Sequence, residues 1–214
     1  MNKFYAVYGA SGCGRSLMPI ARECITTGET IYFIDDALTS EQQINGHKVI
    51  NYDAFKAIKS DEKYILIAIA NSNVRQKISE KISNDGMKLW TVQSQLTILM
   101  DNVIIGEGAA LSPFMTIGAN VKIGKCFHAN LYSYVEHDCV IGDYVTFAPR
   151  VSCNGNIHIQ DHAYIGTGAV IRQGTPDKPL IIGKGAVVGM GAVVTNDVPA
   201  GVTVVGNPAK VLVK

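Results

Sequence analysis

The sequence lacks several features that mark whole classes of protein. Its longest apolar runs, such as residues 64–70, are too short to cross a bilayer. Its N-terminus has no cationic region, apolar run and cleavage site of a signal peptide. Nineteen basic residues against eighteen acidic ones leave a formal charge of +1, with no basic run that favours nucleic acid or an anionic membrane. We therefore expect a cytoplasmic protein that binds neither.

Cysteine is sparse and unpatterned. There are five, an odd number without a C-x-x-C pair, which argues against a disulfide framework and against a thiolate zinc site. We expect most of them to be small core residues. The length of 214 residues, with a hydrophobic fraction of 47%, suits one large or two small domains.

Residues 1–95 alternate between apolar strands and helices. The expected strands are residues 3–9, 30–36, 64–70 and 88–92, and the expected helices are residues 12–28, 52–58 and 73–86. The strands are almost continuously apolar, which is typical of a small parallel sheet covered by helices. This βαβ pattern predicts a Rossmann-like α/β domain over residues 1–95.

From Ile105 onward the apolar pattern has a period of six. The twelve apolar positions are Ile105, Leu111, Ile117, Ile123, Ala129, Val135, Ile141, Phe147, Cys153, Ile159, Ile165 and Ile171. Such a repeat marks a parallel β-helix, in which each hexapeptide forms one short face and points one side chain inward. Neighbouring rungs then pair at about 4.8 Å. The pattern predicts a second domain over residues 96–214.

One segment interrupts this repeat. Eleven residues separate Ile171 from Ile182, where two hexapeptides need twelve, so the repeat resumes one residue out of phase. The intervening residues 172–181 contain Pro176 and Pro179. Because proline cannot donate to a strand ladder, we expect a loop that leaves the β-helix here.

Several motifs carry a resemblance to a known family. The stretches IGEGAALSPFMTIGANVKIG and IIGKGAVVGMGAVVTNDVPAGVTVVGNPAK resemble left-handed β-helix acyltransferases. The N-terminal motifs YGASGCGRS, FIDD and IAIANSNVRQKI, followed by EHD in the β-helix, narrow the resemblance to the NeuD/PglD family of sugar acetyltransferases, over nearly the whole chain. The resemblance implies a left-handed parallel β-helix, acetyl-CoA as co-substrate and a homotrimer with its active site between subunits. It also implies acetyl transfer to the 4-amino group of a UDP-linked amino-dideoxy sugar in bacterial glycan biosynthesis.

The loop GASGCG follows an expected strand and opens an expected helix. Its backbone N–H groups are suited to receive a phosphate or a ribose group. Its glycines do not have the G-x-G-x-x-G spacing of a dinucleotide fold. Asp35 and Asp36 nevertheless end the next strand, where an acid meets a ribose hydroxyl in Rossmann-like proteins. A nucleotide-sugar site, a nicotinamide site and a structural role in turn and cap formation all stay open.

The family resemblance favours a uridine nucleotide site in this domain. It implies contacts with the diphosphate, the uridine end and the rest of the pocket, which would be made respectively by Ser11 and Gly12, by Asp35 and Asp36, and by Asn71 and Arg75. An arginine in such a pocket is suited to pair with a phosphate.

His137 is the candidate general base. It lies two residues beyond the inward Val135, so we expect it at a corner of the β-helix or facing a groove between subunits. An amine that attacks a thioester must lose a proton, and imidazole is the side chain suited to accept it. From the residues alone, either Asp138 or Glu136 is able to hold the second ring nitrogen. The resemblance selects Asp138, and it aligns Asn130 with an active-site asparagine.

The expected reaction is direct transfer without an acyl-enzyme. His137 takes the proton from the amine and returns it to the CoA thiolate, while the Gly155 N–H holds the oxyanion, an interaction commonly worth about 3 kcal/mol. Cys139 and Cys153 fall on apolar repeat positions, so we interpret them as packing residues. The resemblance implies further acetyl-CoA contacts along the β-helix and at a CoA phosphate, made by Gly155, Thr167, Gly189, Met190, Gly191 and Lys210.

Some alternatives remain open at this point. Cys13 and Thr146 stand where many family members carry histidine, so the identity of the acceptor is in doubt. O-acetylation of a sialic acid or another sugar hydroxyl would use the same base, and a nucleotide-sugar-binding scaffold without catalysis would use the same folds. A zinc site is disfavoured, because His158 and His162 are four residues apart while the repeat places equivalent positions six or eighteen apart.

Overall fold

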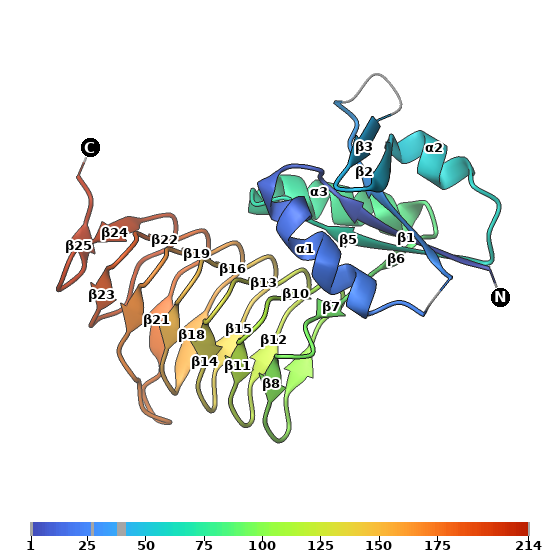
Figure 1. Ribbon diagram of the computed structural model, residues 1–214. Coiled ribbons are helices and arrows are strands. Elements are labelled where there is room, and N and C mark those ends of the chain that lie inside the picture. Colours follow the sequence, from blue (N-terminus) through green and yellow to red (C-terminus); the bar gives the residue numbers. More distant parts are fainter. Residues whose placement is uncertain (1, 27, 38–41, 214) are drawn as a thin grey trace. The chain divides into compact units, whose positions relative to one another are not determined.

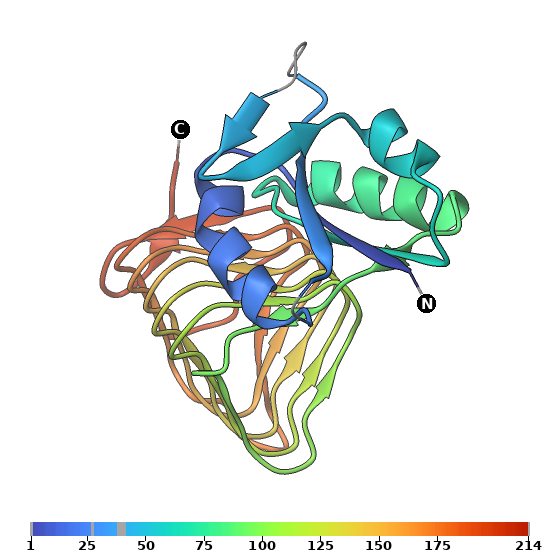
Figure 2. The same cartoon turned by 45° about the vertical axis from the view of Figure 1, so that its right-hand side comes forward.

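The chain divides into two compact units. The structure is a computed structural model that describes residues 2–26, 28–37 and 42–213. Its units are Met1–Ser94 and Gln95–Lys214. Figures 1 and 2 show helices and a sheet in the first unit and a ladder of short strands in the second. Within the described ranges, no helix is long and apolar enough to cross a membrane.

The first unit contains a six-stranded sheet in the order β3-β4-β2-β1-β5-β6. The strands are β1 (Lys3–Tyr8), β2 (Thr30–Ile34), β3 (Gln42–Ile44), β4 (His47–Ile50), β5 (Glu62–Ile67) and β6 (Lys88–Leu89). All neighbours pair in parallel except β3, which is antiparallel to β4. In Figure 1, α1 (Gly12–Glu23) and α3 (Ser72–Asn84) lie on opposite faces of this sheet, while α2 (Tyr52–Ala57) precedes β5. The predicted Rossmann-like α/β arrangement is confirmed.

Several details of this unit differ from the sequence prediction. The strands expected at residues 64–70 and 88–92 are Glu62–Ile67 and Lys88–Leu89. The β3–β4 hairpin was missed, although its turn residues Asn45 and Gly46 have φ values of 48° and 79°, as an Asn-Gly hairpin turn requires. The helix predicted over residues 12–28 ends at Glu23, because Cys24 already acts as its C-cap. An apolar helix pattern persists a few residues beyond the point where the backbone leaves the helix.

The second unit is a prism with three faces of short parallel strands, which follows β7 (Val92–Gln93). The first face contains β10 (Ala110–Leu111), β13 (His128–Ala129), β16 (Thr146–Phe147), β19 (Tyr164–Ile165), β22 (Val187–Val188) and β24 (Thr203–Val205), with β25 (Lys210–Val211) antiparallel at its end. The second contains β8 (Ile98–Leu99), β11 (Thr116–Ile117), β14 (Tyr134–Val135), β17 (Ser152–Cys153), β20 (Val170–Ile171) and β23 (Val193–Val194). The third contains β9 (Ile104–Ile105), β12 (Lys122–Ile123), β15 (Val140–Ile141), β18 (Ile157–Ile159) and β21 (Leu180–Ile182).

The six-residue repeat accounts for the core of the prism. Strands stack in register, so that Thr116 pairs with Tyr134 and Tyr134 pairs with Ser152, eighteen residues further on each time. Eleven of the twelve repeat positions are buried, and Ile105 at the first rung packs against the same cluster while half-buried. The predicted parallel β-helix is confirmed, because each turn buries one inward side chain per face.

Each corner of the prism needs a residue in the left-handed backbone region. At the corner between the second and third faces, these residues are Asn102, Asn120, Asp138 and Asn156, with φ values between 55° and 61°. Asparagine and aspartate tolerate this conformation better than other residues with a side chain. The corner that carries the EHD motif is therefore built on a column of Asn and Asp side chains.

The predicted interruption is a loop at this same corner. It connects β20 with β21 and ends at Pro179, since Leu180 and Ile181 already belong to β21. The Gly174 N–H donates to the Gly155 carbonyl at 3.0 Å, which ties the loop to the rung below. The loop therefore leaves the prism one rung beyond Gly155.

Candidate active site

His137 and Asp138 form a hydrogen-bonded pair at the corner between β14 and β15. The His137 Nδ1 atom lies 2.8 Å from the Asp138 Oδ2 atom, and both side chains are about half exposed. Asp138 has a φ of 57°, so its backbone turns the chain and directs its carboxylate alongside the preceding residue. A carboxylate bound to Nδ1 holds the proton there and leaves Nε2 as the acceptor. Of the two acids that the sequence left open, the structure places Asp138 at the ring.

Gly155 lies against the other edge of the imidazole. A Cβ atom at this glycine would be 2.6 Å from the Nε2 and Cε1 atoms of His137. Such a contact is too short, so any side chain there would displace the ring. The absence of a side chain at Gly155 therefore allows His137 to lie against the backbone of the next rung.

The peptide between Asn154 and Gly155 is oriented by a buried thiol. The Sγ atom of Cys139 donates to the Asn154 carbonyl at 3.1 Å, and Cys139 is fully buried. In a trans peptide the N–H points opposite to the C=O. The Gly155 N–H is thus directed away from the interior, on the outer side where an oxyanion would lie.

The hydrogen bond with Cys139 and burial hold the pKa of Cys153 well above its ordinary value, as expected for a packing thiol.

Asn120 is a residue of this site that sequence reasoning missed. Its Nδ2 atom donates to the Asp138 Oδ1 atom at 3.0 Å, from one turn of the prism below. The hydrogen bonds from His137 and from Asn120 hold the pKa of Asp138 below its ordinary value. The spacing of eighteen residues between Asn120 and Asp138, which is one full turn of three hexapeptides, was a usable signal.

The predicted active-site asparagine, Asn130, and most of the predicted acetyl-CoA residues lie at a different corner. Asn130 follows β13, Thr167 follows β19, and Gly189–Gly191 follows β22, so all of them lie between the first and second faces. His137 and Gly155 lie between the second and third faces, with β14 and β17 between the two corners. One prism therefore does not bring these two predicted groups together. Lys210 lies on the exposed strand β25 at the end of the prism.

The three glycines of the GASGCG loop have different surroundings. Gly9 has a φ of 111°, and a Cβ at Gly14 would be 1.7 Å from the Gly9 carbonyl oxygen. These two glycines are needed for the turn and for the close approach of α1. Gly12 has no neighbour within 4 Å of a Cβ position, and Ser11 caps α1 without a side-chain hydrogen bond. Both predicted diphosphate contacts therefore have space and polar groups available for a ligand. These are Ser11 and Gly12.

The two predicted acids differ in how far the protein uses them. Asp36 accepts the Tyr8 hydroxyl at 2.5 Å and the Tyr52 N–H at 2.7 Å, so both of its oxygens have partners. Asp35 accepts the N–H groups of Ala37 at 3.1 Å and of Ala10 at 3.4 Å, which are longer contacts. Asp36 thus binds the first N–H group of α2, which is the structural role in cap formation that the sequence left open. Asp35 is the better candidate for contact with a ligand.

Arg75 is a correction to the expected phosphate contact. It is completely buried, and its Nη1 atom donates to the carbonyls of Ile69 at 2.8 Å and Ala70 at 3.2 Å. It therefore holds the loop before α3 from inside. Asn71 is the N-cap of α3 and accepts the N–H groups of Asn73 and Val74 with its side chain. The cap thus uses the side-chain oxygen of Asn71 and not its amide nitrogen.

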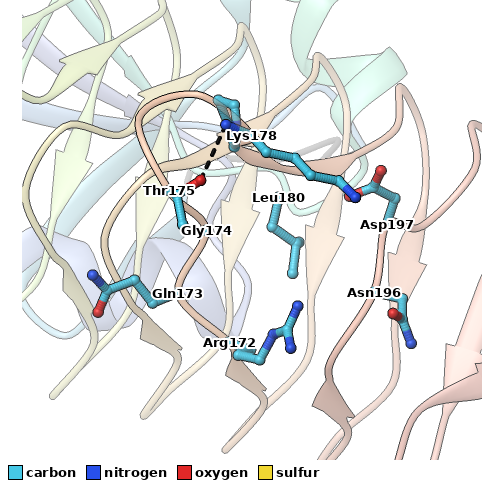
Figure 3. Close-up of a pocket in the computed structure, with 9 residues that line it drawn as sticks. Arg172, Gln173, Gly174, Thr175, Lys178, Leu180, Asn196 and Asp197 are labelled. Atoms are coloured by element: carbon cyan, nitrogen blue, oxygen red, sulfur yellow. Dashed lines mark hydrogen bonds between the residues drawn. The ribbon is translucent and has the colours of Figure 1, made fainter.

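A cavity of about 370 Å³ lies beside the loop that follows β20. It is lined by Arg172, Gln173, Gly174, Thr175, Lys178, Pro179, Leu180, Asn196 and Asp197. Figure 3 shows the Lys178 side chain extended toward Asp197 across this cavity. The cavity lies on the corner that also carries His137 and Gly155, and sequence reasoning did not identify it.

The described part of the chain contains no group of three or more His, Cys, Asp or Glu side chains arranged to hold a metal ion. His162 stacks on Tyr144, with the ring centroids 5.1 Å apart. The His162 ring therefore packs against the aromatic ring that lies one turn away on the prism.

An α/β unit followed by a left-handed parallel β-helix, with a His–Asp pair at a corner of its hexapeptide turns, defines a class of acyltransferases. Comparison with known proteins narrows the class. A family model described as the PglD N-terminal domain matches residues 5–82. The GDP-perosamine N-acetyltransferase of Escherichia coli O157:H7 is 49% identical over 210 residues, which cover 96% of this chain and 95% of that protein.

Two solved structures are similar over almost their whole length. WeeI from Acinetobacter baumannii AYE has a TM-score of 0.95 and 59% identity, and the match covers 98% of this chain and 100% of that one. The acetyltransferase domain of PglB from Neisseria gonorrhoeae FA1090, in complex with acetyl coenzyme A, has a TM-score of 0.87 and 30% identity, with 99% and 100% covered. The chain belongs to the PglD-like family of sugar acetyltransferases, as the sequence motifs indicated.

Proposed function

We propose that this chain transfers the acetyl group of acetyl-CoA to the amino group of a nucleotide-linked amino sugar. The observation that carries the proposal is the His137 imidazole, held by Asp138 at Nδ1 and lying with Nε2 against the Gly155 backbone. A proton acceptor and an outward N–H donor thus lie side by side, as acyl transfer to an amine requires. The similarity to a GDP-perosamine N-acetyltransferase and to an acetyl-CoA complex of PglB supports both substrates.

The reaction follows from these groups in two steps. The amine nitrogen attacks the thioester carbonyl carbon while His137 Nε2 takes the amine proton, and the oxyanion that forms accepts the Gly155 N–H. The intermediate then collapses, its C–S bond breaks, and the imidazolium gives the proton to the departing thiolate. Asp138 stabilises the imidazolium between the two steps, since it already binds Nδ1.

The nucleotide of the acceptor is the first feature to test. The family resemblance implies a UDP-linked 4-amino sugar, whereas the relative of 49% identity is named for GDP-perosamine. That identity extends through the N-terminal unit, where Ser11, Gly12 and Asp35 have groups available for a ligand. We therefore place GDP-linked amino sugars before UDP-linked ones as acceptors of this chain.

We further propose that the active site forms between copies of the chain. His137 lies at one corner of the prism, and the predicted acetyl-CoA residues Thr167 and Gly189–Gly191 lie at another. A second copy is able to bring its acetyl-CoA corner to the His137 corner of the first. The prism also exposes large apolar side chains that a homotrimer would cover, among them Ile98, Ile104, Leu131 and Val140.

The experiment is a screen of acetyl-CoA-dependent thiol release over GDP-linked and UDP-linked amino sugars. Hydroxyl counterparts of these sugars and free sialic acid are included as acceptors. We expect release only with the amino sugars and its loss in His137→Ala. Release with a hydroxyl acceptor or with sialic acid would establish O-acetylation instead.

The matched control is His158→Ala, which removes another half-exposed histidine from the same prism. We expect this variant to retain the wild-type rate. No release with any acceptor, although the protein still binds a nucleotide sugar, would identify a binding scaffold and overturn the proposed catalysis.

A further inference from the structure

A chain of three hydrogen bonds leads from the imidazole down the corner of the prism. Asp138 Oδ2 lies 2.8 Å from His137 Nδ1, and Asn120 Nδ2 donates to Asp138 Oδ1 at 3.0 Å. Asn102 Nδ2 in turn donates to Asn120 Oδ1 at 3.1 Å. The proposed base is therefore connected to two asparagines that lie one and two turns away from it.

The backbone fixes the register of this chain of side chains. Asn102, Asn120 and Asp138 have φ values of 57°, 61° and 57°, so their side chains leave the corner in the same way on successive turns. The Asp138 N–H donates to the Ala119 carbonyl, and the Asn120 N–H donates to the Asp101 carbonyl, both at 3.0 Å. Rungs about 4.8 Å apart are spaced so that stacked amide side chains bond to one another.

The direction of these hydrogen bonds follows from the negative charge of the Asp138 carboxylate. An ionised carboxylate only accepts hydrogen bonds, so Asn120 must present its amide nitrogen to Asp138. Its amide oxygen then faces down and needs a donor, which the Asn102 amide nitrogen supplies. Asp138 thereby orients both amides, and the amides in return hold one oxygen of Asp138.

We propose that Asn120 is a positioning residue for His137, acting through Asp138, an inference that rests on the proposed function. The Asp138 side chain is 47% exposed, so water competes for it and its side-chain torsions have room to change. Asn120 holds Oδ1, which leaves Oδ2 directed at His137 Nδ1 and keeps the proton on that nitrogen. Asn102 holds the Asn120 amide and acts one step further away.

The test is Asn120→Gly, because glycine adopts a positive φ without strain and the backbone turn survives. We expect kcat to fall about tenfold, the effect of one charge-assisted hydrogen bond, with KM for both substrates unchanged. The matched control is Asn102→Gly, which removes an amide at the same φ but does not touch Asp138. We expect it to change kcat by about twofold or less.

A double-mutant cycle separates positioning from structural support. If Asn120 acts through Asp138, Asn120→Gly causes no further loss of kcat in an Asp138→Ala background. A loss of equal size in both backgrounds would overturn the proposal, as would an unchanged kcat in Asn120→Gly alone.

A measurement without substrate separates this proposal from the proposed function. The chain has five histidines, so ¹⁵N NMR of the imidazoles, assigned with His137→Ala, reports the His137 tautomer. We expect a single Nδ1–H form in the wild-type protein and in Asn102→Gly, and a mixture of tautomers in Asn120→Gly. The same single form in Asn120→Gly would overturn the role of Asn120, whereas an inactive wild-type protein with the expected tautomers would overturn only the proposed function.

Discussion

His137 is held between its sequence neighbour and a residue that lies one turn away along the prism. Its neighbour Asp138 holds one ring nitrogen, and Gly155, eighteen residues further on, leaves space for the other edge of the ring. A half-exposed histidine on a protein surface usually samples several orientations. Here the Asp138 carboxylate contacts one side of the ring and the Gly155 backbone lies against the other, so the space open to the ring is limited.

The glycine side of this arrangement is testable by adding a single methyl group. In Gly155→Ala the Cβ would lie 2.6 Å from His137 Nε2, so the ring must move away from the Gly155 N–H. We expect kcat to fall by about a hundredfold or more, since displacements of about 1 Å at a reacting group have effects of this size. Steady-state kinetics with circular dichroism would measure the rate and the retained fold.

Gly142→Ala, at the next corner of the prism, is the control for adding a side chain that presses against the adjacent rung. Its Cβ would lie 2.5 Å from Asp161 Oδ1 and would also crowd the backbone of the adjacent rung. We expect this variant to lose stability while its folded fraction keeps the wild-type kcat. An equal loss of kcat in both alanine variants would contradict the specific role of Gly155.

At the scale of elements, charged side chains that bind backbone groups hold the loops of the first unit. Arg75 of α3 bonds the backbone of the loop that precedes its own helix, and Asp36 after β2 bonds the first N–H of α2. Both were expected to contact a nucleotide. A charged residue at the end of a strand or in the first turns of a helix looks the same in sequence for either role.

Arg75→Met separates these roles. The variant leaves the Ile69 and Ala70 carbonyls without their buried partner, so we expect the free energy of unfolding to fall by about 3 kcal/mol. Chemical denaturation measures this loss, and the exposed Arg22→Met is the control, with an expected change within about 0.5 kcal/mol. An unchanged stability with a raised KM for the nucleotide sugar would restore the phosphate contact.

The side-chain contacts between α2 and the end of α3 predict that the stability of the protein depends on pH. Asp85, the C-cap of α3, accepts the Lys56 ammonium at 2.6 Å and the Tyr52 hydroxyl at 2.8 Å. The hydrogen bonds from Lys56 and then Tyr52 hold its pKa below the ordinary value of 3.8. Because this pKa is lowered in the folded protein, the stabilisation is fully present above the ordinary value and is lost as the pH falls through the folded value.

Asp85→Asn should therefore lower the melting temperature at neutral pH but not in strong acid. We expect a difference from the wild-type protein at about pH 7 that closes by about pH 2. Thermal melts across this range measure it. A difference that stays constant with pH would show that the carboxylate charge is not its source.

At the scale of the whole molecule, the residues of the proposed reaction lie on two different corners of the prism. The base and the oxyanion donor lie on one corner, and the predicted acetyl-CoA residues lie on another, separated by the width of a face. Under this proposal a single prism carries half of each of two sites. This is the physical reason to expect activity from an oligomer rather than from a monomer.

Mixing two inactive variants tests this division. We expect His137→Ala and Thr167→Trp each to abolish thiol release, because one lacks the base and the other blocks the acetyl-CoA corner. In randomly mixed homotrimers, about a quarter of the sites would combine two intact corners and regain activity. Co-expression followed by kinetic assay measures the recovery, and sedimentation measures the assembly. No recovery in a verified mixed trimer would place both corners of a site on one chain.

The spacing of residues was sufficient to predict the prism, whereas the family resemblance selected His137 as the candidate base. A side chain every sixth residue must point inward when each hexapeptide makes one face, so the apolar step from Ile105 to Ile171 determined the core, and His137 beside two acids stood out against that background. The short β3–β4 hairpin was not predicted, because its strands are too short to show a clear alternation.

Contacts between turns became visible only in the folded chain. Asn120 and Asp138 are eighteen residues apart, as are His137 and Gly155, and each pair meets because the chain completes a turn and stacks its rungs in register. The burial of Arg75 likewise depends on how α3 packs, since one cation in a helix fits an exposed face and a sealed interior equally well until its neighbours are placed. Local periodicity thus determined which residues face inward, whereas packing across turns decided which polar residues work together.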